Sequence, residues 1–208
     1  MTGKDIVFRP VPVDVPVARF EAGQLLERFP YRAPAVVAQA LRPFAEDRIV
    51  CDLGCGGGDL IWLISRYAKQ GIGIEIDQTR ARLAARRAES SDCLQFLQID
   101  YWAESIPRAD VYYAWPNDPD TFRAIAERLH AHCSPCLLAA GAAQSFFESE
   151  RDPAVESTEN RLADGRRSHV LSLVDQYGGE VITFPYEEDS ARPEWSGTGT
   201  WALALITL

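Results

Sequence analysis

A run of glycines between two apolar segments constrains the fold of this chain more than any other feature. The segment 54–58 (GCGGG) follows the short apolar run 49–53 (IVCDL) and precedes residues 59–70, whose apolar side chains recur at helical spacing. We therefore expect a buried strand, a glycine turn and a helix in direct succession. Glycine adopts positive φ without a steric penalty and lets a ligand approach the backbone closely. The pattern predicts a binding site where this strand ends.

Strand-like and helix-like periods alternate along most of the chain. Segments with strand patterns are separated by helical stretches of about 10–15 residues, which predicts a parallel sheet with crossover helices. Near the C-terminus two strand patterns follow each other without a helix, which predicts an antiparallel pair at the sheet edge. The expected strands are 49–53, 71–76, 93–99, 109–115, 135–141, 180–186 and 199–208, and the expected helices are 34–45, 59–70, 79–90, 119–132 and 168–179.

The first thirty residues differ in composition from the rest of the chain. Residues 5–20 are rich in Pro and Val and cannot form a helix interior, so we expect residues 1–30 to be an extended arm followed by a short helix over 21–28. Residues 31–208 are expected to form one domain. Residues 141–167 carry little pattern and are expected to be either a lid or a loop.

The overall charge of the chain narrows the classes of partner. Its 208 residues include 30 acidic and 21 basic side chains, a formal net charge of −9 at pH 7. Binding to a nucleic-acid backbone needs clustered Lys and Arg, so we expect no nucleic-acid partner. No run approaches the about 20 apolar residues of a membrane span, and the N-terminus has no signal-peptide pattern. We therefore expect a cytoplasmic protein, with no membrane partner, whose five cysteines are reduced thiols.

Three acidic residues follow the first three strands of the predicted parallel sheet. Asp52 stands two residues before the first glycine, Glu75 ends the next strand, and Asp100 follows the third. Because parallel strands end at the same edge of a sheet, these carboxylates are expected to lie around one crevice. A dinucleotide fingerprint would need a third glycine where Asp59 stands, and a carboxylate at Asp52 is a poor neighbour for a pyrophosphate. The pattern favours a ligand with a ribose, an adenine-like ring and a cationic head, without phosphate.

The segments VCDLGCGGGD, GIEID and LQFLQID resemble those of the class I S-adenosylmethionine-dependent methyltransferases. The resemblance covers roughly residues 31–140. It implies an α/β fold, a Rossmann-like doubly wound sheet of seven strands, mostly parallel with an antiparallel C-terminal edge pair. It also implies that residues 31–208 are a methyltransferase domain whose cofactor is S-adenosyl-L-methionine. The cofactor-binding residues that it implies are Tyr31, Asp52, Gly54, Cys55, Gly56, Glu75, Ile76, Asp100, Tyr101, Trp102 and Ala114.

Two further segments bear on the branch of this family. Residues 31–37 (YRAPAVV) look like the Tyr-x-x-Pro segment, followed by valines, of a subset that includes lysine methyltransferases of the non-SET type. The usual Thr before Pro34 is Ala33 in this chain. After the fourth strand, residues 114–117 (AWPN) depart from the Asn/Asp-Pro-Pro-aromatic sequence of amino-methylating members. Methylation of an amino group is therefore not implied by that segment.

The resemblance places the methyl acceptor at the carboxyl end of the fourth strand. We expect Tyr113 and Trp115 to wall the acceptor pocket and Asn117 to orient the nucleophile. The expected activity is methyl transfer to a small-molecule acceptor, because the chain is short and acidic and has no added recognition domain. A protein lysine N-methyltransferase and a non-catalytic protein that binds an adenosyl ligand are open alternatives. The glycine spacing disfavours a nicotinamide oxidoreductase.

One cluster has the composition of a metal site. His130, His132, Cys133 and Cys136 are close together in the sequence. The two histidines close a predicted helix, where imidazoles suit the helix dipole, and Cys136 opens an apolar strand. We therefore expect structural roles for these residues and no metal.

Overall fold

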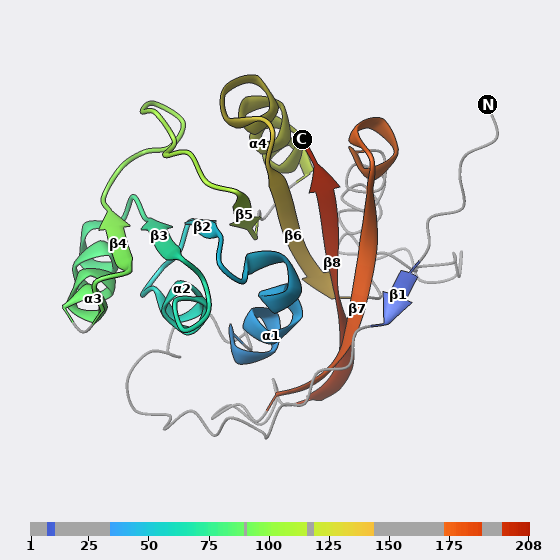
Figure 1. Cartoon of the computed structure of the whole chain (residues 1–208), viewed down its shortest axis with the longest axis horizontal. Helices are drawn as coiled ribbons and strands as arrows, with labels where there is room; N and C mark the ends of the chain where they lie inside the picture. The colour runs from blue at the N-terminus through green and yellow to red at the C-terminus, as the bar shows by residue number, and fades with distance from the viewer. Residues whose placement is uncertain (1–7, 11–33, 90, 116–118, 144–172, 189–196) are drawn as a thin grey trace, which may run out of the picture.

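The described strands assemble into a mixed sheet in the order β1-β7-β8-β6-β5-β2-β3-β4 (Figure 1). The computed structural model of the chain describes residues 8–10, 34–89, 91–115, 119–143, 173–188 and 197–208. The strands are β1 (Phe8–Pro10), β2 (Ile49–Leu53), β3 (Gln70–Ile74), β4 (Leu94–Leu97), β5 (Val111–Ala114), β6 (Leu137–Ala143), β7 (Gly179–Glu188) and β8 (Gly197–Thr207). The helices are α1 (Pro34–Ala45), α2 (Asp59–Ile64), α3 (Gln78–Ala88) and α4 (Pro119–Cys133).

The five central strands are parallel, as the alternating pattern predicts. Strands β6, β5, β2, β3 and β4 pair in that order, each parallel to its neighbours among the five. The chain proceeds from β2 outward to β3 and β4 and then returns to place β5 on the other side of β2. This reversal is a topological switch point, where α/β sheets form ligand crevices beyond the carboxyl ends of their strands. The α/β, Rossmann-like prediction is therefore confirmed.

The C-terminal strands form the predicted antiparallel pair, but the pair does not lie at the sheet edge. β8 runs antiparallel to both β6 and β7. The edge beyond β7 is β1, whose residues Phe8–Pro10 pair parallel with Val181–Thr183. The described sheet therefore has eight strands, one more than predicted, because part of the expected N-terminal arm pairs with β7. The predicted helix over 21–28 lies outside the described residues, and the domain division at residue 30 stays a prediction.

α2 is shorter than its sequence pattern predicts. The apolar periodicity covers 59–70, but the helix ends at Ile64. The Ser65 hydroxyl donates a hydrogen bond to the Trp62 carbonyl at 2.7 Å, so a side chain takes a helical carbonyl that the backbone would otherwise use. The chain then turns directly into β3. None of the described helices is long and apolar enough to cross a lipid bilayer.

The helix predicted before β7 ends at glycine, as expected. Residues 173–177 are helical, and residues 168–172 lie outside the described part of the chain. Gly178 follows with a φ of 86°, and its N–H donates to the carbonyl of Val174 at 2.9 Å. Glycine takes this left-handed conformation at helix C-termini without a steric penalty.

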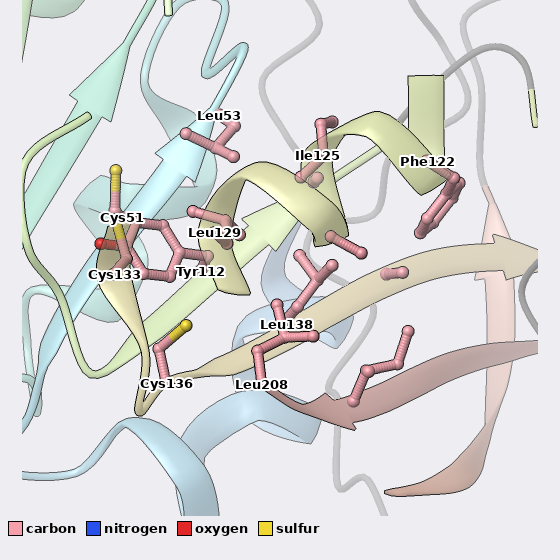
Figure 2. Packing of buried hydrophobic residues seen from close by; sticks show 14 of the residues in the cluster. Cys51, Leu53, Tyr112, Phe122, Ile125, Leu129, Cys133, Cys136, Leu138 and Leu208 are labelled. Carbon is pink, nitrogen blue, oxygen red and sulfur yellow. The ribbon is translucent and has the colours of Figure 1, made fainter. Parts of the chain in front are cut away.

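Two apolar layers cover the two faces of the sheet. On one face, α1 and α2 pack over Val50, Val111 and neighbouring strand residues. On the other face, α4 packs over Cys51, Tyr112 and Leu138 (Figure 2). Successive residues of one strand point to opposite faces, so both layers draw on the same strands. Because both faces are covered, the carboxyl edge of the strands is the place where polar side chains can gather.

Tyr112 connects the core beneath α4 to the loop before β5. Its hydroxyl donates to the Pro107 carbonyl at 2.6 Å and accepts the Ala109 N–H at 2.8 Å. The Tyr112→Phe variant leaves both backbone groups unsatisfied, so we expect it to lower the free energy of unfolding by about 1–3 kcal/mol in urea titrations. The control is Tyr177→Phe, which removes the hydroxyl group from a half-buried ring that lies against His130. Equal stability of Tyr112→Phe and wild type would contradict this account.

Candidate functional site

The glycine turn after β2 requires glycine at three positions. Gly54, Gly56 and Gly58 have φ values of 80°, 56° and 80°. Residues with side chains enter this left-handed region at a cost of about 1–2 kcal/mol each. Gly58 also serves as the N-cap of α2. The glycine pattern in the sequence is therefore explained by the path of the backbone between β2 and α2.

Hydrogen bonds hold the first half of the turn against the end of β3. The N–H groups of Gly54 and Cys55 both donate to the Ile74 carbonyl, at 2.9 and 2.8 Å. The N–H of Gly56 donates to Oε2 of Glu75 at 2.9 Å. The position of the turn is thus set by the neighbouring strand and by the carboxylate that follows it.

Open space borders the first two glycines of the turn. Within the described part of the structure, a Cβ built on Gly54 or Gly56 would have no neighbouring atom within 4 Å, apart from adjacent residues. A Cβ built on Gly58 would instead lie 2.6 Å from the ring of Phe96. The first two glycines therefore expose backbone to a ligand, whereas the third packs against the protein.

Glu75 joins three parts of the site. Its side chain is buried, with Oε2 accepting the Gly56 N–H and Oε1 accepting the Asp77 N–H, each at 2.9 Å. Asp77 in turn caps α3, because its carboxylate accepts the Arg80 N–H. A carboxylate has about four acceptor positions, so these two N–H groups leave Glu75 with capacity for hydroxyl donors.

Asp52 is the second buried carboxylate of the site, with only 4% of its surface exposed. In the strand register it lies between Gly73 of β3 and Tyr113 of β5. Paired residues of parallel strands point to the same face of the sheet, so Asp52 and Tyr113 point to the face that α1 and α2 cover. Asp52 therefore stands beside both the glycine turn and the end of β5.

The cysteine within the turn is a neutral thiol. Burial, and then the negative charges of Asp52 and Glu75, raise the pKa of Cys55 well above its ordinary value. Burial and Asp52 raise the pKa of the Cys51 thiol in the same way. Because the thiolate is the nucleophilic form, neither cysteine is suited to attack a ligand. Cys55 contributes its volume to the site.

Asp100 forms the turn that follows β4. Its Oδ1 accepts the Trp102 N–H at 2.8 Å, and its own N–H donates to Glu104 Oε1 at 3.2 Å. Such Asp-initiated turns are common structural features. The turn places Tyr101 and Trp102 with their ring centroids 4.9 Å apart. The predicted contacts of Asp100 and Tyr101 with an adenine ring stay predictions.

Two large apolar side chains are exposed next to these acids. Ile76, directly after Glu75, is 63% exposed, and Trp102 is 42% exposed. They are the large apolar residues that the described part of the chain leaves most open to solvent. Apolar side chains at the rim of a polar crevice are suited to the faces of a flat aromatic ligand.

The predicted residues at the end of β5 differ in burial, both those expected for the acceptor and Ala114, which was expected to contact the cofactor. Tyr113 and Ala114 are buried, with 4% and 1% of their surfaces exposed, whereas Trp115 is half-buried. A Cβ built on Gly141 of β6 would lie 2.6 Å from two atoms of the Trp115 ring and 2.9 Å from the Tyr113 hydroxyl oxygen. The Trp115 ring therefore lies directly on the backbone of Gly141. Asn117 lies outside the described residues.

The structure brings part of the predicted site together. Asp52, Gly54, Cys55, Gly56 and Glu75 meet in and around the turn. The predicted residues after β4 form a turn of their own, and those of β5 lie beside Asp52 in the sheet. The predicted cofactor contact of Tyr31 lies outside the described residues.

Sequence reasoning missed Gly73 and Phe96, which pack against the turn. A Cβ built on Gly73 would lie 2.5 Å from Phe96 and 2.8 Å from the sulfur of Cys55. The signal for this contact was present in the sequence, because a glycine within a strand often marks a close approach of another segment. The aromatic partner on β4 carries no comparable signal.

Asp59, at the position where a dinucleotide fingerprint has its third glycine, has a structural partner. Its Oδ1 lies 2.5 Å from Nη2 of Arg87, so an ion pair joins the start of α2 to the end of α3. The guanidinium of Arg87 also lies 5.8 Å from the ring centroid of Trp62. The acid at this position is thus used between two helices and not in the crevice.

The His/Cys cluster is divided between the surface and the core. His130 and His132 are exposed, whereas Cys133 and Cys136 are buried. Among the residues that the structure describes, no group of three or more His, Cys, Asp or Glu side chains could hold a metal ion. The absence of a metal at these residues stays a prediction.

Comparisons with solved structures show the fold of the chain. No protein-family model and no curated protein sequence matches it. A protein proposed to be an O-methyltransferase from Klebsiella pneumoniae has a TM-score of 0.59 at 12% identity, over 90% of this chain and 86% of that one. The C-terminal domain of precorrin-6Y C5,15-methyltransferase from Rhodobacter capsulatus has a TM-score of 0.57 at 14% identity, over 83% and 87%. A protein proposed to be an RNA methyltransferase from Pyrococcus horikoshii has a TM-score of 0.56 at 16% identity, over 85% and 84%.

These solved structures share the class I methyltransferase fold, and this chain has that fold. At identities of 12–16% the likeness does not extend to the acceptor. The three proteins are described as acting on, or proposed to act on, different kinds of acceptor.

Glu75 provides a test of the site that needs no ligand. In Glu75→Gln an amide NH₂ replaces one of the two oxygens that accept backbone N–H groups. We expect the free energy of unfolding to fall by about 1.5–3 kcal/mol, because a hydrogen bond to a charged acceptor is lost in a buried place. Urea unfolding monitored by fluorescence measures this change.

The matched control for this variant is Glu104→Gln. Glu104 also accepts a backbone N–H, at 3.2 Å, but its side chain is exposed. We expect its stability to stay within about 0.5 kcal/mol of wild type. Equal effects of the two substitutions would show that Glu75 does not organise the turn.

Proposed function

We propose that the chain binds S-adenosyl-L-methionine at the glycine turn and transfers its methyl group to a small-molecule acceptor. The observation that carries the proposal is a pair of buried carboxylates, Asp52 and Glu75, beside a positive-φ glycine turn that borders open space. The two carboxylates place negative charge at one strand edge, which favours a ligand with positive charge and hydrogen-bond donors over one with a phosphate. The class I methyltransferase fold supports the same interpretation.

The residues of the site fit the parts of this cofactor. Glu75 has acceptor capacity for the two ribose hydroxyls beyond its backbone bonds. Ile76 and Trp102 offer exposed apolar surface to the adenine ring. Asp52 supplies negative charge near the turn, which suits the cationic methionine end. Two carboxylates at this edge disfavour a pyrophosphate, so a nicotinamide dinucleotide fits the site less well.

Methyl transfer requires the protein to align the two reactants more than to transfer a proton. When bound, the cofactor supplies a methyl group already activated by a positively charged sulfur. The residues around the turn and β5 then have to hold the two reactants in line and exclude water, and such proximity is worth about 7–11 kcal/mol. A general base is needed only where the acceptor loses a proton as it attacks.

The acceptor class follows from charge and from the end of β5. Trp115 lies on Gly141 beside Tyr113, which supports the proposal that these aromatics wall an acceptor pocket. The net charge of −9 disfavours an RNA acceptor. The proposal is tested against three alternatives. The acceptor could be a lysine side chain of a protein, it could be an RNA, or the chain could bind the cofactor without catalysis.

The deciding experiment follows labelled methyl groups. Purified protein is incubated with methyl-labelled S-adenosyl-L-methionine and a cell extract separated by size into metabolites, RNA and protein. We expect label in the metabolite fraction. Label on protein lysine or on RNA would show that the acceptor is a macromolecule and not a small molecule. Binding of the cofactor without transfer to any fraction would show that the chain is a binding protein and not an enzyme.

Gly56→Ala tests the cofactor site itself. A methyl group at Gly56 enters the open space beside the turn, so we expect the Kd for S-adenosyl-L-methionine to rise by at least about tenfold. Isothermal titration calorimetry measures the change. The matched control is Gly178→Ala at a helix end far along the chain, where φ is also positive (86°, against 56° at Gly56) and a Cβ would likewise meet no described atom within 4 Å.

Both substitutions carry a similar backbone strain of about 1–2 kcal/mol, so a difference between them reports on the ligand. A Kd raised equally by Gly56→Ala and Gly178→Ala would place the cofactor elsewhere or attribute the effect to stability alone.

Gly141→Ala separates the acceptor from the cofactor. The added methyl group would displace the Trp115 ring, which lies 2.6 Å from its position. Misplacing a residue by about 1 Å can cost up to about 100-fold in rate, so we expect a clear loss of kcat/KM for the acceptor with an unchanged cofactor Kd. Gly71→Ala, whose methyl group would meet Ile61 and Leu94 at 3.0 Å, controls for crowding in the core. An unchanged kcat/KM in Gly141→Ala would remove Trp115 from the acceptor pocket.

A further inference from the structure

The ring of Phe96 occupies the space that two glycines leave empty. A Cβ built on Gly58 would lie 2.6 Å from Cε1 and Cζ of this ring, and one built on Gly73 would lie 2.5 Å from Cδ1 and 2.6 Å from Cε1. Real Cβ atoms essentially never approach other atoms within 3.0 Å. Gly58 belongs to the turn, Gly73 to β3 and Phe96 to β4. One ring therefore packs directly on the backbone of two separate segments.

Cys55 of the turn packs on Gly73 beside the same ring. The sulfur of Cys55 would lie 2.8 Å from a Cβ on Gly73, so Cys55 and Phe96 share the hollow above that glycine. Cys55 and Gly58 are joined in turn, since the Gly58 N–H donates to the Cys55 carbonyl at 2.9 Å. Ala84 of α3 lies on the other side, 3.2 Å from the Gly58 Cβ position.

The two halves of the turn are thus attached to the neighbouring strands by different means. Hydrogen bonds to Ile74 and Glu75 hold Gly54, Cys55 and Gly56. Beyond Gly56 the turn consists of glycines, which lose the most conformational freedom on ordering and have no side chains to anchor them. Gly58 is restrained by its hydrogen bonds with Cys55 and Trp62, and Phe96 adds the packing contact that holds it against β4.

We propose that Phe96 is a positioning residue that keeps the glycine turn in its binding geometry before any ligand arrives. Its contribution to the affinity for S-adenosyl-L-methionine rests on the proposed function. A turn that has the binding geometry for only a fraction of the time lowers the apparent affinity by that fraction. Its contribution to the order of the turn does not depend on which ligand binds there.

The test compares Phe96→Ala and Phe96→Leu with Leu97→Ala. Leu97 is the next residue of β4 and is also half-buried, but it packs on the other face of the sheet, beneath the α4 layer. Hydrogen exchange of the amides of residues 54–58 is measured on the ligand-free protein, with the amides of β6 as an internal reference. Isothermal titration then gives the Kd for S-adenosyl-L-methionine and for S-adenosyl-L-homocysteine.

We expect Phe96→Ala to speed exchange in the turn and to raise both Kd values on the order of tenfold, relative to β6 and to Leu97→Ala. Phe96→Leu keeps part of the volume and is expected to show the same changes at a smaller size, so it decides the matter if Phe96→Ala does not fold. Unchanged exchange in both Phe96 variants, or equal effects of Leu97→Ala, overturns the proposal. If the wild-type protein binds neither compound, the proposed function fails while the exchange comparison still decides the role of Phe96.

Discussion

The glycine-rich backbone over 54–58 has almost no side chains of its own, so its shape depends on what β3 and β4 provide. The Ile74 carbonyl receives two N–H groups of the turn and the Glu75 carboxylate receives a third. Phe96 supplies the packing below. The same carboxylate also receives the first N–H of the segment that leads into α3. A single buried acid thus fixes the glycine turn and the segment before α3 relative to each other.

Parallel pairing explains why residues far apart in sequence meet at this edge. The register places Asp52 between Gly73 and Tyr113, and all three side-chain positions point to one face. The opposite face is filled by Tyr112, Cys51 and the α4 residues (Figure 2). Asp52, proposed for the cofactor, and Tyr113, proposed for the acceptor, therefore share a face because their strands are neighbours. The strand order reverses between β2 and β5, which is where α/β sheets form ligand sites.

The features predictable from sequence were those with a local signal. Glycines at 54, 56 and 58 indicate a backbone with positive φ. The acids Asp52 and Glu75 stand at the carboxyl ends of strand patterns, so the central sheet and the turn could be predicted. The pairing of β1 with β7 could not be predicted, because three residues of a Pro- and Val-rich arm carry no sign of a distant partner. The packing of Phe96 on Gly58 and Gly73 is also non-local. Asp100 was expected to end its strand, but β4 ends at Leu97 and Asp100 lies in the turn that follows, where its carboxylate accepts the Trp102 N–H.

The position of β8 has a consequence for the order in which the sheet can be completed. β6 and β7 are not paired to each other, and both are paired to β8, which follows them in the chain. On a ribosome, the parallel half from β2 to β6 emerges complete, while β7 and the β1 strand attached to it wait for a later segment to bridge them. Until that segment is released, β6 presents an unpaired edge to solvent, so this is the interval in which the nascent chain is most exposed to aggregation.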